Sequence, residues 1–268
     1  MFNITYNQSK HRVYFRYGTR EVNTKTGRHT VKTTTATLAK VVGQKANKED
    51  ILEAVFSETV GLLTKSNHRA CGYAMDVTNP ASVQDVHDHV VSEHGPIDVL
   101  VNNAGGAGPN DPLKTTPEQF LKTLEWNVLP AFALTRLAVP LLRAGGAEQP
   151  GSVINITSAA ARYAQRSFSG YGTAKAALTQ LTRLLAQDFA PTVRVNAIAP
   201  GPVVTDALAK YLTADVRGAM ERRTPLARLG TVEDIAAAAL YLAAPASSWM
   251  TGKTLELDGG AEATVWPL

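Results

Sequence analysis

Residues 70–101 read A-C-G-Y-A-M-D-V-T-N-P-A-S-V-Q-D-V-H-D-H-V-V-S-E-H-G-P-I-D-V-L-V. Two short apolar runs, 70–77 and 97–101, are typical of strands. Between them, residues 81–95 have the apolar spacing of an amphipathic helix, which Gly95 closes. A strand, a helix and a second strand within about 30 residues predict a parallel βαβ unit.

The same alternation continues toward the C-terminus. It predicts strands at 152–157, 193–199 and 254–258, and helices at 117–142, 170–189 and 231–244. Thr231 and Asp234 form a capping-box-like pattern at the start of the last helix. Because such crossovers are right-handed, the helices must cover both faces of the sheet. We therefore predict an α/β fold with a doubly wound, Rossmann-like parallel sheet in a single domain, with ligands beyond the carboxyl ends of the strands.

Residues 1–57 have a different character from the predicted domain over 58–268. Residues 1–48 carry a net charge of +9, whereas the rest of the chain carries −5. The pattern indicates an atypical basic segment with a strand near 12–17 and helices near 36–42 and 49–63. We interpret it as a solvated arm rather than a nucleic-acid-binding arm, because aromatic residues are few and no known binding module is visible.

Composition narrows the class of protein. Cys71 is the single cysteine, so neither an internal disulfide nor a cysteine-based zinc site can form, and we expect no metal site. No apolar run approaches the ~20 residues of a membrane span. These features indicate a soluble protein of a reducing, cytoplasmic compartment that binds neither a membrane nor nucleic acid.

Tyr171 and Lys175, in Y-G-T-A-K, are the first candidates for chemistry. Four residues apart on a helix, they share one face, so the ammonium can favour the ionised phenol. For proton exchange near neutral pH, the pKa of a tyrosine must fall from about 10 to about 7, a change worth about 4 kcal/mol. Tyr6 and Lys10 have the same spacing without the surroundings of the first pair, and serve as the comparison case.

Polar residues close to predicted strand ends support this choice. Ser158 follows the strand at 152–157 and can donate a hydrogen bond to a substrate carbonyl, although a strand-end serine also caps local backbone. Asn127 lies in an otherwise apolar helix and needs partners for its amide, in the backbone or in a water near Lys175. The small residues of V-N-N-A-G-G (101–106) would let a flat ligand approach the backbone, unless they only form a tight turn.

Five motifs share one order and spacing: N-N-A-G (102–105), Asn127, Ser158, Tyr171 with Lys175, and the pair P-G-P-V-V-T (200–205) and L-D-G-G (257–260). Over roughly residues 58–263, they resemble the short-chain dehydrogenase/reductase (SDR) family. The resemblance implies reversible hydride transfer between NAD or NADP and an alcohol or ketone. Three stretches look most like 7α-hydroxysteroid dehydrogenases, and nearly as much like 3-oxoacyl-carrier-protein reductases: N-N-A-G-G-A-G-P (102–109), A-P-G-P-V-V-T-D-A-L (199–208) and R-L-G-T-V-E-D-I-A (228–236).

The resemblance also implies roles for individual residues. Tyr171 looks like the catalytic acid/base, Lys175 like the group that lowers its pKa and binds the nicotinamide ribose, and Ser158 like the carbonyl anchor. Asn127 looks like the holder of a proton-relay water. The other implied cofactor-binding residues are Asp76 and Val77 at the adenine, Asn103, Ala104 and Gly105 beside the adenosine, and Pro200, Gly201, Val203 and Thr205 at the nicotinamide.

One family feature is missing. Members carry a T-G-x-x-x-G-x-G turn in which glycines let the backbone approach the pyrophosphate. The nearest candidate, Thr26 and Gly27, is followed by Val31 and Thr33 where glycines belong. Either cationic residues replace the glycines, or cofactor binding is impaired, or the amino end is altered relative to the family. A non-catalytic scaffold or oligomer partner is therefore the alternative to an active enzyme.

Substrate and assembly follow only from the resemblance and from apolar content. Residues 206–224 would form a substrate-covering lid in which Leu208, Tyr211 and Met220 favour an apolar alcohol or ketone. Family members are usually homotetramers built through two long helices and the last strand. Trp249 and Trp266 suit such an interface, although as core residues they need no partner. A serine hydrolase is disfavoured, since no G-x-S-x-G occurs.

Overall fold

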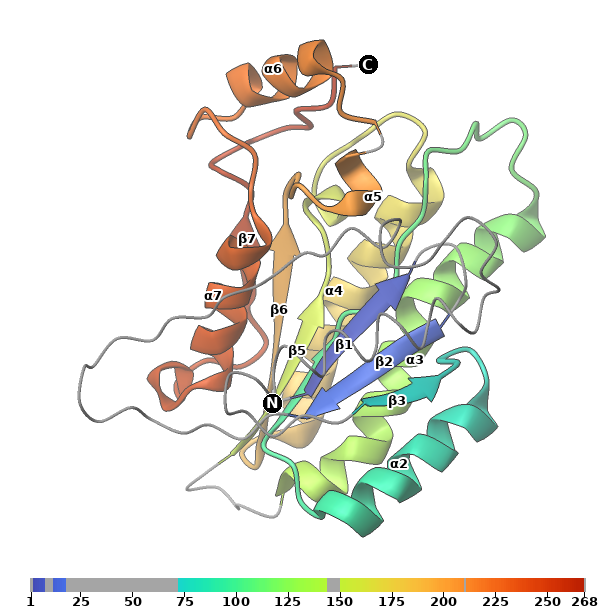
Figure 1. Cartoon of the computed structure of the whole chain (residues 1–268), viewed down its shortest axis with the longest axis vertical. Helices are drawn as coiled ribbons and strands as arrows, with labels where there is room; N and C mark the ends of the chain where they lie inside the picture. Colours follow the sequence, from blue (N-terminus) through green and yellow to red (C-terminus); the bar gives the residue numbers. More distant parts are fainter. Residues whose placement is uncertain (1, 8–11, 18–71, 144–149, 210, 268) are drawn as a thin grey trace, which may run out of the picture.

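The computed structural model describes residues 2–7, 12–17, 72–143, 150–209 and 211–267. Its centre is a parallel sheet in the order β4-β5-β6-β7 (Figure 1). The strands are β4 (Val99–Asn102), β5 (Gly151–Ile156), β6 (Val193–Pro200) and β7 (Thr254–Leu257). β4, β5 and β6 are buried almost throughout, as their Val- and Ile-rich sequences require when helices cover both faces.

Helices cover both faces of this sheet. α2 (Pro80–His94), α3 (Pro117–Leu142) and α4 (Ser169–Phe189) contribute Val86, Leu134 and Leu185 to one buried cluster. α7 (Val232–Ala243) contributes Leu242 to a second cluster on the other face, together with Ile154 of β5. The doubly wound parallel arrangement is confirmed for this part of the chain, with element bounds close to the predicted ones.

Local signals explain where the helices begin. Thr116 and Gln119 form a capping box at the start of α3, and Pro117 occupies the first turn. The capping box that was predicted from Thr231 and Asp234 is present at the start of α7. Gly95 closes α2 with φ +69°, a conformation that other residues rarely adopt.

The amino end differs from the predicted parallel pattern. β1 (Phe2–Asn7), β2 (Arg12–Tyr17) and β3 (Gly72–Met75) form an antiparallel sheet in the order β1-β2-β3. The predicted strand at 12–17 is confirmed. The predicted strand at 70–77 is shorter and pairs antiparallel with β2. Because β3 lies in this sheet and β4 in the parallel one, the parallel βαβ unit predicted over 70–101 is not formed. The predicted helices at 36–42 and 49–63 and the Thr26–Gly27 turn lie outside the described residues.

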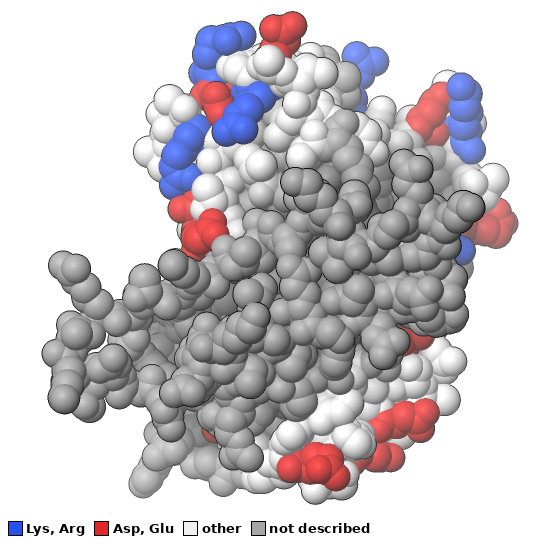
Figure 2. Space-filling view, in the orientation of Figure 1, with Lys and Arg blue, Asp and Glu red and all other residues white. Residues whose placement is uncertain are grey.

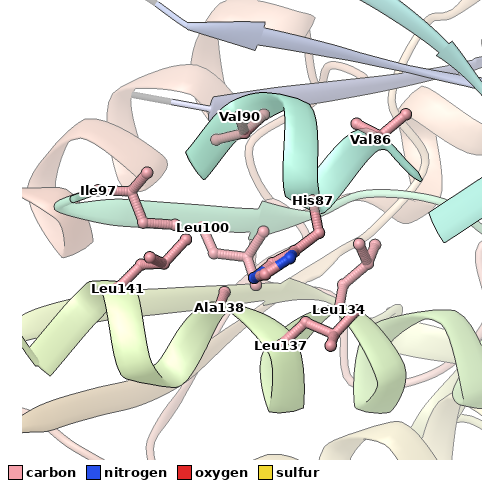
Figure 3. A pocket seen from close by; sticks show the side chains of 9 residues that line it. All are labelled: Val86, His87, Val90, Ile97, Leu100, Leu134, Leu137, Ala138 and Leu141. Carbon is pink, nitrogen blue, oxygen red and sulfur yellow. The ribbon is translucent and has the colours of Figure 1, made fainter. Parts of the chain in front are cut away.

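The surface and the core each add one observation. In Figure 2 the charged side chains visible over α2 are acidic, whereas both signs mix over α6 (Ala214–Arg223), so the described part of this face shows no continuous basic patch. No helix among the described residues is long and apolar enough to cross a membrane. A small pocket of about 40 Å³ lies between α2, β4 and α3, lined by aliphatic residues and His87 (Figure 3).

Candidate active site

The carboxyl ends of three neighbouring parallel strands bring the predicted site residues together. β4 ends at Asn102, β5 at Ile156 and β6 at Pro200, so the loops that follow them leave the sheet at one edge. α4 begins at Ser169 and places Tyr171 in its first turn. The edge where ligands were expected therefore carries the loop 103–106, Ser158, Tyr171 and Gly201.

Ser158 and Tyr171 meet at this edge. Ser158 is the N-cap of the short helix η3 (Ala159–Ala161), where its Oγ accepts a hydrogen bond from Ala160 N at 3.1 Å. The same side chain hydrogen-bonds to Tyr171. The serine thus combines the local capping role with a contact to the candidate acid/base.

Lys175 lies one helical turn beyond Tyr171 and is buried, with 3% of its surface exposed. Its Nζ donates to Ile156 O at 3.0 Å and lies 5.9 Å from the centroid of the Tyr171 ring. Burial lowers the pKa of Lys175 to about 8. The structure therefore presents the phenol and the ammonium side by side, as the helical spacing predicts.

The pKa of Tyr171 does not follow the expectation. In the protein alone, burial raises it above the usual value for tyrosine, and the hydrogen bond with Ser158 offsets only part of this effect. The expected lowering by Lys175 is absent, because burial of the phenol dominates its pKa. Tyr171 is therefore a protonated phenol at neutral pH.

Asn127 on α3 holds the loop after β4. Its Oδ1 accepts from Gly106 N at 2.8 Å, and its Nδ2 donates to Gly106 O at 3.2 Å and to Thr123 O at 2.9 Å. Of the two kinds of partner that the sequence allowed, the side chain takes the backbone, which explains how an amide can be 1% exposed in an apolar helix.

Gly105 sits where a side chain cannot fit. A Cβ atom there would lie 2.7 Å from Asn127 Oδ1 and 2.9 Å from Lys175 Nζ, and its φ of +141° favours glycine. The glycine thus allows the loop, the amide and the ammonium to converge. The neighbouring Ala104 packs against the core cluster under α2 and α3, and Asn103 is partly buried.

The residues implied at the adenine end take local roles in the structure. Asp76 accepts hydrogen bonds from Thr78 N at 2.9 Å and from Thr78 Oγ1 at 2.7 Å. Val77 is 4% exposed and its side chain belongs to the core. Any contact that Val77 makes to a ligand would therefore come from its backbone.

The residues implied at the nicotinamide end follow β6. Gly201 N donates to Leu257 O at 2.8 Å, directly after Pro200 at the end of that strand. Val203 forms an isolated parallel bridge with Gly230. Thr205 is exposed, and its Oγ1 accepts from Leu208 N at 3.3 Å at the start of α5 (Asp206–Ala209).

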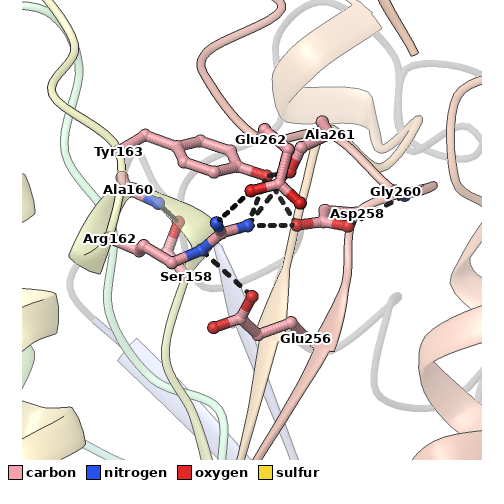
Figure 4. Close-up of polar contacts among 9 residues, drawn as sticks. All are labelled: Ser158, Ala160, Arg162, Tyr163, Glu256, Asp258, Gly260, Ala261 and Glu262. Carbon is pink, nitrogen blue, oxygen red and sulfur yellow. Dashed lines mark hydrogen bonds and ion pairs between the residues drawn. The ribbon is translucent and has the colours of Figure 1, made fainter. Parts of the chain in front are cut away.

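Sequence reasoning missed an ion-pair cluster beside Ser158. Arg162 and Tyr163, which follow η3, contact Asp258 at the end of β7 (Figure 4). Asp258 stands in the quoted motif L-D-G-G, but its partners are about 95 residues away along the chain. Only a tertiary contact could have revealed them.

The described residues contain no group of three or more histidines, cysteines or acids placed to hold a metal ion.

The chain is similar to known proteins over most of its length. A family model described as enoyl-(acyl carrier protein) reductase matches residues 26–262. An uncharacterised oxidoreductase of Mycobacterium tuberculosis is 49% identical over 198 residues, covering 73% of this chain and 74% of that protein. The 7alpha-hydroxysteroid dehydrogenase of Escherichia coli strain K12 is 39% identical over 186 residues, covering 69% and 71%.

A solved structure is also similar in fold. The structure of a 7 alpha-hydroxysteroid dehydrogenase complexed with NADH and 7-oxo glycochenodeoxycholic acid matches with a TM-score of 0.73 at 36% identity, covering 78% of this chain and 80% of that one. The fold and the site define a Rossmann-like oxidoreductase. The chain belongs to the short-chain dehydrogenase/reductase family, whose members are NAD(P)-dependent dehydrogenases and reductases.

Proposed function

We propose that the protein reduces the carbonyl group of an apolar ketone, or oxidises the corresponding alcohol, with Tyr171 as acid/base and Ser158 as carbonyl anchor. The observation that carries this proposal is the convergence of Ser158, Tyr171 and Lys175 at one sheet edge, with Lys175 Nζ 5.9 Å from the Tyr171 ring. Hydride transfer needs a proton donor or acceptor beside the carbonyl oxygen, and this pair supplies it.

The residues present fit a nicotinamide cofactor, NAD or NADP, at its nicotinamide-ribose end. Lys175 is buried and donates one of its three N–H groups to Ile156 O, which leaves two N–H groups of the ammonium for a ligand. Gly105 leaves the space next to the ammonium without a side chain. Lys175 would hold the ribose hydroxyls, and Val203 and Thr205 the carboxamide. When bound, the cofactor supplies or accepts the hydride.

The protein's own residues handle the proton. In the direction of reduction, Ser158 donates a hydrogen bond to the carbonyl oxygen and orients it toward Tyr171. Tyr171 gives its proton to that oxygen, and the Lys175 ammonium stabilises the resulting phenolate. Because burial raises the pKa of Tyr171, the phenol is protonated at neutral pH, which is the form that carbonyl reduction requires.

The lid gives partial support for an apolar substrate. α5 and α6 occupy the predicted lid at 206–224. Leu208 is partly buried and Tyr211 is 58% exposed, so both are available at the lid surface. Met220 is 1% exposed and packs with Leu229 and Val265, so it supports the lid from beneath rather than facing the substrate as expected.

Two substrate classes are to be compared. One is a hydroxysteroid with its corresponding ketone, and the other is a 3-oxoacyl thioester. The solved relative bound to 7-oxo glycochenodeoxycholic acid supports the steroid. We favour a 7-oxo steroid for that reason.

We further propose a homotetramer built on α3 and α4. Leu121, Leu129 and Phe132 are 53%, 55% and 44% exposed, and their spacing places them on one face of α3. Leu184 on the neighbouring helix α4 is 53% exposed. Large apolar side chains that line one face of a surface helix are typical of a subunit interface.

The test is a fluorescence titration of the full chain with NADH and NADPH, followed by turnover with a 7-oxo bile acid and with a 3-oxoacyl thioester. We expect saturable binding and cofactor oxidation that depends on the ketone. Absence of saturable binding would instead support a non-catalytic member of the fold, in line with the missing glycine turn. Turnover of the thioester alone would move the substrate class to 3-oxoacyl groups.

A further inference from the structure

Arg162 makes an unusual number of contacts for a surface residue. Its Nε lies 3.0 Å from Glu256 Oε2, its Nη2 3.1 Å from Asp258 Oδ2 and its Nη1 3.2 Å from Glu262 Oε2 (Figure 4). Nη2 also donates to Ala261 O at 3.0 Å. A planar guanidinium can satisfy several acceptors at once in this way, which a lysine ammonium at the end of a flexible stem cannot reproduce.

Tyr163 reinforces the same contact. Its hydroxyl lies 2.5 Å from Asp258 Oδ2 and also hydrogen-bonds to the Ala261 carbonyl oxygen. The Arg162 guanidinium lies over the Tyr163 ring, 4.7 Å from its centroid. Burial of Asp258 acts to raise its pKa, but hydrogen bonds from Tyr163, Gly260 N and Arg162 outweigh burial and hold the pKa below the usual range. Asp258 is therefore an ionised, almost buried anchor.

The anchor segment 257–262 also contacts two other parts of the site. A Cβ atom on Gly201 would lie 2.7 Å from Asp258 Cα, so the loop after β6 rests directly on this segment. Leu226 N donates to Gly259 O at 3.1 Å, just beyond the end of α6. The segment thus connects the proposed nicotinamide loop with the base of the lid.

The turn that carries Ser158 is the third part of the site that is connected to the segment 257–262. Ser158 is the N-cap of η3 and Arg162 its C-cap, so the two residues are the ends of one short turn. Arg162 therefore ties the turn of the carbonyl anchor to the segment that supports the nicotinamide loop and the lid.

We propose that Arg162, held by Asp258 and Tyr163, is a positioning residue that fixes the Ser158 turn relative to Gly201 and the lid. The inference rests on the proposed function, because Ser158 is the group that it positions. Three carboxylates converge on this one guanidinium. Without it, they would repel one another and Asp258 would lose its cation, so the turn and the anchor segment would separate.

Three variants test this inference. Arg162→Gln removes the charge, and Tyr163→Phe removes only the hydroxyl. Arg228→Gln is the matched control, since Arg228 makes an Arg–carboxylate pair with Asp234 at 2.7 Å, at the start of α7 rather than beside Ser158. For each variant, kcat and KM for the ketone, the dissociation constant for NADH or NADPH, and the primary isotope effect with deuterated cofactor are measured.

Misplacement of the carbonyl should lower kcat/KM by about 10- to 100-fold in Arg162→Gln, with a larger isotope effect and an unchanged cofactor dissociation constant. Tyr163→Phe should change the same quantities in the same direction by less. A loss of kcat/KM equal to that of Arg228→Gln, without a change in the isotope effect, would overturn the proposal. If Arg162→Gln does not fold, Tyr163→Phe alone decides by the same criteria.

Amide hydrogen exchange on the full chain separates this inference from the proposed function. Exchange at 158–163 should be faster in Arg162→Gln than in wild type, while exchange in α4 stays the same. Unchanged exchange at 158–163 contradicts the positioning role whatever the activity. A wild-type protein that turns over no ketone contradicts the proposed function, and the exchange result then still decides whether Arg162 holds the turn.

Discussion

Tyr171 and Lys175 illustrate what burial does to two groups one helical turn apart. Desolvation raises the pKa of the phenol and lowers that of the ammonium, so both groups are displaced toward their neutral forms. The phenol therefore releases its proton less readily here than in water, a direction opposite to that expected from the sequence.

Tyr171→Phe tests the acid/base role. The substitution removes the hydroxyl and leaves the ring and Lys175 in place, so turnover should fall by at least about 100-fold while cofactor binding persists. Steady-state assays and fluorescence titration measure the two quantities. Turnover close to that of wild type would refute the assignment, and Tyr241→Phe, at an exposed tyrosine on α7, provides the control.

The lowered pKa of Lys175 predicts that the stability of the folded protein depends on pH. Its pKa is about 8 in the folded protein and 10.5 in the unfolded chain, so between these pH values the unfolded chain holds a proton that the folded protein has released. Stability from this group therefore rises with pH across that window. Lys175→Met should be more stable than wild type at pH 7, by up to about 3 kcal/mol, with the difference shrinking toward pH 10.

Urea denaturation at several pH values measures this difference. Lys122 on α3 is exposed, so Lys122→Met should show the same pH dependence as wild type. A constant difference between Lys175→Met and wild type from pH 7 to pH 10 would contradict the interpretation.

At the scale of elements, most of the parallel part of the fold follows from the sequence. Hydrophobic period and capping residues predict the four parallel strands and the helices that cover them, because these signals are local. The pairing of β3 with β2 depends on contacts between residues about 60 positions apart, Val13 with Met75. No local pattern encodes such a pairing.

The candidate site likewise combines residues that local signals identify with residues that only tertiary contacts bring together. The spacing of Tyr171 and Lys175 and the strand end before Ser158 are local signals, and they identify residues that the structure brings together. The Arg162–Asp258 contact and the burial of Met220 arise from packing between distant segments. Their discovery required the tertiary structure.

The buried guanidinium of Arg194 binds backbone oxygens at the C-terminal end of α7 and just beyond it. Arg194 on β6 is 6% exposed, and its Nη atoms donate at 3.0 Å to Leu242 O, Ser247 O and Ser247 Oγ. Arg194→Met would remove three buried hydrogen bonds while Leu242 O and Ser247 O keep Ser152 Oγ and Met250 N as donors, and we expect a loss of about 3 kcal/mol in the free energy of unfolding. Arg183→Met, on the exposed side of α4, should cost far less.

Chemical denaturation measures both variants. Turnover per folded molecule should be unchanged in Arg194→Met, because Arg194 contacts the end of a helix and not the site. A cost no greater than that of Arg183→Met would show that solvent or other groups replace the guanidinium.

For the molecule as a whole, the small pocket between α2, β4 and α3 leaves room for added volume. Val86 lines it, so Val86→Ile adds one methylene to unoccupied space and should stabilise the protein by about 1 kcal/mol, or about 2–4 °C in melting temperature. Val83 is 3% exposed and does not line the pocket. Val83→Ile should therefore destabilise by overpacking, and equal effects of the two variants would contradict this view.

Assembly is the second property at this scale. If α3 forms a subunit interface, Leu129→Glu together with Phe132→Glu should convert the tetramer to smaller species, since both side chains are exposed in one chain. Light scattering coupled to size-exclusion chromatography measures the mass. An unchanged tetramer would place the interface elsewhere, and a monomeric wild type would rule out the assembly.

Gly105 has a practical consequence for anyone who redesigns this enzyme. A randomised library at that position would return almost only glycine among functional clones, because even alanine would press on Asn127 and Lys175 together. Diversity is better introduced at Leu208 and Tyr211, where altered side chains can select new ketones without disturbing the groups that carry out the chemistry.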